Sequence, residues 1–111
     1  MTGNTGEQDV PALELYYSFA QEDEVLCLEL EKRLKPLERE NLVKGWHRGK
    51  IQSGANVAQE IESHRQRANI ILLLLSPDYI AFDDCYAEMQ WALQRKQNEL
   101  LIIPIDRKSV V

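Results

Sequence analysis

Apolar side chains gather in four short segments of the chain, and polar stretches separate them. Residues 12–19 read ALELYYSF, and residues 70–75 are the uninterrupted run IILLLL. Residues 42–46 and 100–105 are also largely apolar. Short aromatic and aliphatic segments that stop at polar residues are typical of buried strands. An uninterrupted run such as IILLLL indicates a central parallel strand that is covered on both faces.

The leucines between the first two segments predict a helix. Ser18 followed by Gln21 fits a capping box, so we expect the helix to begin there. Pro36 is expected to mark its end, because proline cannot continue the helical hydrogen bonds. The predicted buried face consists of leucines that recur every three or four residues, namely Leu26, Leu30, Leu34 and Leu37.

Two further helices are predicted before the third and fourth strands. Asn56 with Gln59 can open the second helix, which should end at Asn69, and a long loop precedes it. After an irregular segment behind Ser76, Asp83 and Asp84 can cap the third helix. The predicted inner faces are Val57, Ile61, His64 and Ala68 in the second helix and Cys85, Met89, Ala92 and Leu93 in the third.

The alternation of strands and helices predicts an α/β fold. We expect a flavodoxin-like open parallel sheet in the order 2-1-3-4, with helices on both faces. Residues 1–11 are small and polar and are expected to be a disordered leader, so that the domain covers residues 12–111. The sheet lacks a fifth strand, and we expect that it was lost by C-terminal truncation or that a partner supplies it.

Composition narrows the class of protein. A chain of 111 residues holds one domain, and its 44% hydrophobic and 28% charged content is that of a globular protein. With 13 basic and 18 acidic residues its formal charge is −5, which argues against a nucleic-acid partner. Cys27 and Cys85 are expected to be reduced thiols. No secretion signal or bilayer-spanning run is visible, so we expect a cytoplasmic protein without a membrane partner.

Common catalytic motifs are missing, which leaves one acidic residue as the main candidate. Neither the glycine-rich phosphate loops nor the GxSxG and HExxH motifs occur, and the two histidines do not form a metal pair, so no metal is expected. Glu88 falls at the border of the apolar stripe of the third helix, where its carboxylate would be partly desolvated. The alternative is an ordinary first-turn glutamate that the helix dipole favours.

Other candidates lie at the predicted carboxyl ends of the strands, where open parallel sheets bind ligands. Ser18, next to Phe19, and Ser76 could bind a phosphate or ribose, or each could simply cap the chain that follows. Trp46 could stack on a base while Arg48 and Lys50 meet a pyrophosphate. Equally, the tryptophan could belong to the core and the two cations to a solvated loop. The expected roles of the histidines are a loop position for His47 and a semi-buried, hydrogen-bonded one for His64.

Three motifs together resemble a TIR (Toll/interleukin receptor) domain of the prokaryotic type. LELYYSFAQEDE resembles the family's first strand and turn, and LVKGWHRGKIQSGANV its second strand and long BB loop. The most specific motif is ANIILLLLSPDYIAFDDCYAEMQWAL, which contains the Ser-Pro pair and the Cys-x-x-Glu element of Cys85 and Glu88. The chain departs from the family pattern where His47, Arg48 and Gly49 follow Trp46 without an acidic residue, and at Val57, where an aromatic is common.

This resemblance implies an activity and partners. Enzymatic TIR domains cleave NAD⁺ between nicotinamide and ribose, so Glu88 would be the catalytic glutamate, with Cys85 and the strand-end residues near the substrate. NAD⁺ would be the substrate, with no further cofactor. The resemblance also implies self-association through the BB loop, residues 46–55, within a longer defence protein. A non-catalytic TIR interaction module and a nucleoside-processing transferase are the alternatives.

Overall fold

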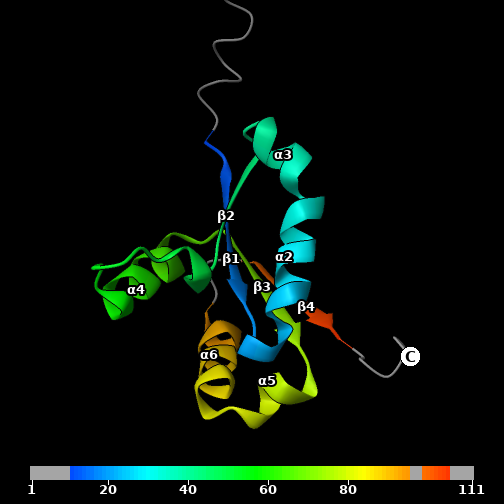
Figure 1. The fold of residues 1–111 in the computed structure, drawn as a ribbon, viewed down its shortest axis with the longest axis vertical. Helices are drawn as coiled ribbons and strands as arrows, with labels where there is room; N and C mark the ends of the chain where they lie inside the picture. Colours follow the sequence, from blue (N-terminus) through cyan, green and yellow to red (C-terminus); the bar gives the residue numbers. More distant parts are fainter. Residues whose placement is uncertain (1–10, 96–98, 106–111) are drawn as a thin grey trace, which may run out of the picture.

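The protein is described by a computed structural model that covers residues 11–95 and 99–105. Four parallel strands form one sheet in the order β2-β1-β3-β4 (Figure 1). Their bounds are Leu13–Ser18 for β1, Val43–Trp46 for β2, Ile70–Leu75 for β3 and Glu99–Pro104 for β4. The predicted fold class, a flavodoxin-like α/β sheet, is confirmed. The expected leader lies almost entirely in residues 1–10, outside the described residues.

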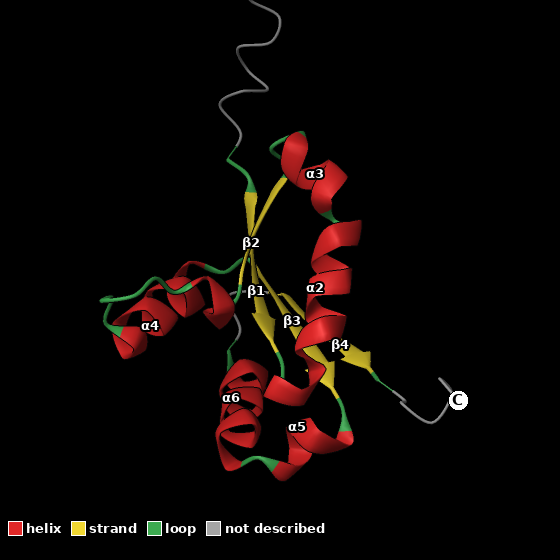
Figure 2. Ribbon diagram, viewed as in Figure 1, coloured by secondary structure: helices red, strands yellow, loops and turns green. Residues whose placement is uncertain are grey.

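Helices cover both faces of this sheet (Figure 2). After β1 come a 3-10 turn, η2, and two helices, α2 and α3; after β2 come the turn η3 and α4, and after β3 come α5 and α6. α2 lies on one face, and α4 and α6 lie on the other. Their bounds are Gln21–Asp23 (η2), Glu24–Arg33 (α2), Lys35–Arg39 (α3), Arg48–Lys50 (η3), Val57–Arg67 (α4), Pro77–Ala81 (α5) and Asp83–Gln94 (α6).

Strand periodicity divides the core between the two faces. Successive side chains of a strand point to opposite faces, so Leu15 and Tyr17 of β1 pack toward α2, with Cys27 at the centre. Tyr16 packs on the opposite face with Trp46, Ile71 and other residues of a second apolar cluster. β3 is the most deeply buried strand, as IILLLL predicts, because helices cover it on both sides. In β4, which lies at the edge of the sheet, Leu101 and Ile102 are about half exposed.

The start and the buried face of α2 differ from the prediction. Ser18 does not cap the helix; η2 begins after Ala20, and no side chain caps it. Leu30 and Leu34 contact the core as expected, whereas Leu26 and Leu37 are exposed to about two fifths. Cys27 is fully buried instead of Leu26. The helical face therefore runs through positions 27, 30 and 34, at the same three- and four-residue spacing but one residue later at its start.

Pro36 and the segment after Ser76 also differ from the prediction. Pro36 lies in the first turn of α3, where its missing N–H costs nothing, and α2 already ends at Arg33. The segment expected to be irregular is the short helix α5, and the side chain of Ser76 caps it by accepting a hydrogen bond from the backbone N–H of Tyr79.

The caps of the two remaining helices give one confirmed and one wrong prediction. Asn56 caps α4 by accepting a hydrogen bond from the backbone N–H of Gln59 at 3.0 Å, as predicted. Asp83 and Asp84 do not cap α6; they occupy its first turn, where negative charge suits the helix dipole. Val57 and Leu93, expected on inner faces, are each more than half exposed. Within the described residues, no helix has the length and apolar character needed to cross a bilayer.

Candidate active site

The buried carboxylate of Glu88 lies against the carboxyl end of β1. Only 5% of Glu88 is exposed, and α6 carries it on the turn that faces the sheet. The Tyr16 hydroxyl donates to its Oε2 at 2.7 Å, and the Ser18 hydroxyl donates to its Oε1. β1 lies between β2 and β3, so this is the point at which successive connections leave the sheet in opposite directions. Open α/β sheets bind their ligands at this point.

Arg65, from the last turn of α4, completes the surroundings of Glu88. Its Nε and Nη2 donate to Oε2 of Glu88 at 3.0 Å and 2.5 Å. Burial alone would lower the pKa of Arg65, but the hydrogen bonds and charge of Glu88 outweigh burial and raise it. The guanidinium also lies 4.7 Å from the ring centre of Trp91, in a cation–π contact. The buried carboxylate is thus paired with a permanent positive charge.

Two tyrosines and a serine form a hydrogen-bonded chain behind Glu88. The hydroxyls of Ser18 and Tyr79 lie 2.7 Å apart. Because Ser18 donates its single proton to Glu88, the Tyr79 hydroxyl donates to Ser18. Burial and the negative charge of Glu88 raise the pKa of Tyr16, and burial raises the pKa of Tyr79. Both phenols therefore keep their protons and act as hydrogen-bond donors.

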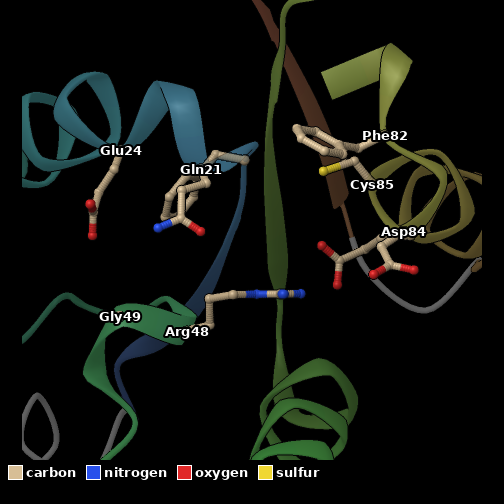
Figure 3. A pocket seen from close by; sticks show the side chains of 9 residues that line it. Gln21, Glu24, Arg48, Gly49, Phe82, Asp84 and Cys85 are labelled. Atoms are coloured by element: carbon tan, nitrogen blue, oxygen red, sulfur yellow. The ribbon is translucent and has the colours of Figure 1, made fainter. Parts of the chain in front are cut away.

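A pocket of about 390 Å³ opens beside Glu88 at this end of the sheet. Figure 3 shows the side chains that line it: they come from the segment after β1, including η2 and the first residue of α2, from η3, and from α6 with the residue before it. Arg48 reaches across the pocket toward the wall that carries Asp84 (Figure 3). The lining combines acidic, aromatic and basic groups and consists of Phe19, Gln21, Glu24, Arg48, Gly49, Phe82, Asp84, Cys85 and Glu88.

The loop that supplies Arg48 and Gly49 is fixed to α2. Lys50 forms an ion pair with Glu31 at 2.6 Å, and His47 lies 3.4 Å from the same carboxylate. Nδ1 of His47 accepts a hydrogen bond from the backbone N–H of Gly49 at 3.1 Å. A Cβ at position 49 would come within 2.8 Å of the His47 ring, so this position requires glycine. These contacts hold Arg48 over the pocket.

Four of the eight residues predicted for the site line this pocket: Phe19, Arg48, Cys85 and Glu88. Ser18 lies behind the carboxylate of Glu88 and binds it directly. Burial, followed by the charge of Glu88, raises the pKa of Cys85, so its thiol stays protonated at neutral pH.

The other three predicted residues lie elsewhere. Trp46 is buried between Tyr16 and His64, with ring centres 5.6 Å and 4.1 Å away, so its faces are not available to a base. Lys50 is held by Glu31. Ser76 caps α5 and donates to Asp23. These placements match the structural alternatives that the sequence left open for Trp46 and Ser76.

Sequence reasoning missed Arg65, Tyr16 and Tyr79. The signal for Arg65 was present, since it follows Ile61 by four residues and precedes Ala68 by three, on the inner side of α4. Tyr16 precedes Ser18 by two residues, and strand periodicity places both on one face. His47, expected to be a loop residue, is 4% exposed and helps to fix its loop to Glu31 of α2. Within residues 11–95 and 99–105, no group of three or more His, Cys, Asp or Glu side chains is placed to hold a metal ion.

The structure thus gives a fold class, the parallel α/β sheet, and a site, the buried carboxylate at the carboxyl end of the first strand. A family model described as TIR domain matches residues 16–109, so the chain belongs to the TIR domain family. This family includes NAD⁺ hydrolases, and TIR domains generally self-associate and interact with other domains.

One similar protein is the uncharacterized protein y4lF of Sinorhizobium fredii (strain NBRC 101917 / NGR234). It is 40% identical to this chain over 93 residues, which cover 82% of this chain and 29% of the relative. The chain therefore spans less than a third of that protein, and the similarity is to one part of a longer polypeptide.

Proposed function

We propose that this TIR domain cleaves NAD⁺ at the bond between nicotinamide and ribose, with Glu88 as the catalytic residue. The observation that carries this proposal is the position of Glu88: a buried carboxylate in the wall of a pocket of about 390 Å³ at the carboxyl end of β1. The pocket is within the range of sizes that hold small ligands. Its aromatic residues, Phe19 and Phe82, offer faces for a planar ring.

The chemistry requires one carboxylate and no general acid. The bond between the pyridinium nitrogen and C1′ of the ribose breaks, and its electron pair stays with the nitrogen, so nicotinamide leaves as a neutral molecule. The ribose passes through an oxocarbenium-like transition state, which a fixed negative charge stabilises. Water then attacks C1′ and loses a proton, giving ADP-ribose. Capture by an adenine nitrogen would give a cyclic product instead.

The charges around the pocket suit a substrate with a cationic ring and anionic phosphates. Glu24 and Asp84 add negative charge to that of Glu88 and favour the pyridinium. Arg48 is the basic side chain on the lining and is the candidate partner of the pyrophosphate. Ser18 supports the carboxylate from behind, so its role is to position Glu88.

We further propose that self-association controls the activity. The loop of residues 46–55 carries Arg48 and Gly49 on the pocket wall, and residues 52–55 of the same loop are exposed. A second copy that contacts this loop would thus contact the edge of the active site. The similar protein is longer than the matched segment, and we propose that other domains of a cytoplasmic defence protein bring copies together.

A second candidate function is a non-catalytic interaction module. The ion pair between Glu88 and Arg65 favours it, because a paired, buried glutamate can serve to join α4 to α6. In that case the loop of residues 46–55 would bind other TIR domains, and no turnover of NAD⁺ would be seen.

Nicotinamide release, measured by liquid chromatography over a range of protein concentrations, tests the proposal. Glu88→Gln keeps the shape of the side chain and removes its charge. Glu29→Gln, an equivalent change on the exposed side of α2, is the matched control. We expect turnover per chain to rise with concentration in the parent and the control and to disappear in Glu88→Gln. A folded parent that releases no nicotinamide at any concentration would overturn the proposal and leave the interaction module as the candidate function.

A further inference from the structure

The Oε2 atom of Glu88 has no acceptor capacity left for a substrate. A carboxylate offers about four lone-pair sites. Tyr16 and both Nε and Nη2 of Arg65 donate to Oε2, whereas Ser18 alone donates to Oε1 and leaves one lone pair of that oxygen unused. A ribose hydroxyl that entered the pocket would find Oε2 occupied and could donate only to Oε1. The guanidinium of Arg65 therefore takes the acceptor capacity of Oε2 that Tyr16 leaves.

Arg65 also cancels the charge that the proposed reaction needs. The transition state gains from a carboxylate that is negative and close to C1′. A guanidinium at 2.5 Å from the same oxygen makes the pair neutral overall, and its positive charge acts on the oxocarbenium in the opposite direction. Tyr16 and Ser18 carry no charge and do not have this effect. Of the three partners, Arg65 is the one whose presence opposes catalysis.

Arg65 is also the partner that can leave. Tyr16 and Ser18 belong to a central strand and are each 2% exposed, whereas the side chain of Arg65 is 23% exposed. None of the residues of α4 is fully buried, and this helix contacts the core through the partly buried side chains of Ile61 and His64. The guanidinium groups of Arg65 and Arg95 lie 4.7 Å and 5.3 Å from the ring centre of Trp91 on α6.

The position of α4 in the chain connects Arg65 to the exposed loop. α4 begins at Val57, directly after the loop of residues 46–55, and all of residues 52–59 are exposed. At the other end, Arg95 donates to the backbone carbonyls of Arg65 and Gln66 and fixes the last turn. A partner that pulls on the loop would shift α4 and with it Arg65, while Glu88 stays on α6.

We infer that Arg65 is an inhibitory counter-ion, which keeps Glu88 in a resting state until a movement of α4 withdraws the guanidinium. This inference rests on the proposed function and adds its regulation. Activation would leave Glu88 held by Tyr16 and Ser18, with a free negative charge toward the pocket. A purely structural arginine would act in the opposite direction, because its loss would lower activity together with stability.

The test compares Arg65→Met with the matched variant Arg67→Met on the same helix. Arg67 contacts His64 and does not contact Glu88. Nicotinamide release is measured at low protein concentration, where the parent is at rest, and thermal unfolding by circular dichroism is recorded for each chain. We expect kcat of Arg65→Met to rise about tenfold, the effect of shifting a mostly resting population to the competent state. Arg67→Met should match the parent.

Arg95→Gln is a second variant, which loosens the last turn of α4 and leaves the pair of Glu88 and Arg65 chemically intact. We expect a smaller rise in kcat, and this variant decides the question if Arg65→Met does not fold. Folded variants whose turnover equals or falls below that of the parent would overturn the inhibitory role, while a Glu88-dependent parent would leave the proposed function standing. No nicotinamide from any chain, even at high concentration, would overturn both.

Discussion

Two adjacent tyrosines of β1 show how the two faces of the sheet differ. Tyr16 faces α4 and α6, and its hydroxyl donates to Glu88 at 2.7 Å. Tyr17 faces α2, and its hydroxyl has no hydrogen-bond partner among the described residues. Each residue is 2% exposed. The face toward α4 and α6 thus joins burial to a charged hydrogen-bond network, whereas the face toward α2 relies on packing.

This difference shows that the two faces of one strand have different roles: one face contributes to stability, and the other contributes to the candidate site. Alternate residues of β1 point to opposite faces, so Tyr16 and Ser18 surround the carboxylate while Leu15 and Tyr17 fill the core under α2. Changes on the α2 face should therefore alter stability and leave the chemistry of the site unchanged. Changes on the other face should alter both.

The largest effect on stability is expected from the α2 face. Leu74→Ala removes most of a side chain that is 1% exposed in the middle of this core. We expect the free energy of unfolding to fall by about 2–5 kcal/mol, from lost burial and the cavity left behind. Urea unfolding measures it, with Leu93→Ala, at a position 56% exposed, as the control. A loss as small as that of the control would contradict the view that this face stabilises the fold.

The two tyrosines allow the faces to be compared with the same chemical change. Tyr16→Phe removes a hydrogen bond to a charged acceptor and should lower the free energy of unfolding by about 1.5–3 kcal/mol. Tyr17→Phe removes a buried hydroxyl without a described partner and should leave stability unchanged or slightly higher. Urea unfolding of both variants gives the comparison. Equal losses would mean that the polar network adds nothing beyond packing.

The fold was predictable because its signals are local and repeated. IILLLL identified the buried central strand, and the alternation of apolar strands with helical stretches identified the parallel sheet. The errors arose where two local readings competed. The sequence around Ser18 fits a helix cap as well as it fits a buried hydroxyl in the core. Only the hydrogen bond to Glu88, 70 residues away in the sequence, decides between these two roles.

The site was less predictable because it depends on contacts between distant elements. Glu88 was a candidate from its place on its own helix and from the family resemblance, but the ion pair with Arg65 joins α4 to α6 and cannot be derived from spacing within either helix. Trp46 and Lys50 looked like substrate contacts because they flank Arg48 in sequence. In the structure His64 stacks on Trp46 and Glu31 pairs with Lys50, and both partners lie on helices.

The smallest expected effect comes from Glu31 of α2, which fixes the loop on the pocket wall through Lys50. Burial alone would raise the pKa of Glu31, but Lys50, together with His47, outweighs it and lowers the pKa below its ordinary 4.5. A carboxyl group whose pKa falls on folding stabilises the fold at pH above its unfolded pKa. This contribution is lost as the pH falls through the lower, folded pKa.

Glu31→Gln should therefore lower the free energy of unfolding at pH 7 by less than about 1 kcal/mol, because Lys50 is partly exposed to solvent. The difference from the parent should shrink as the pH falls below 4.5, since protonation removes the same charge from the parent. Urea unfolding at several pH values measures it, with Glu29→Gln as the exposed control. A difference that persists undiminished in acid would assign the effect to packing.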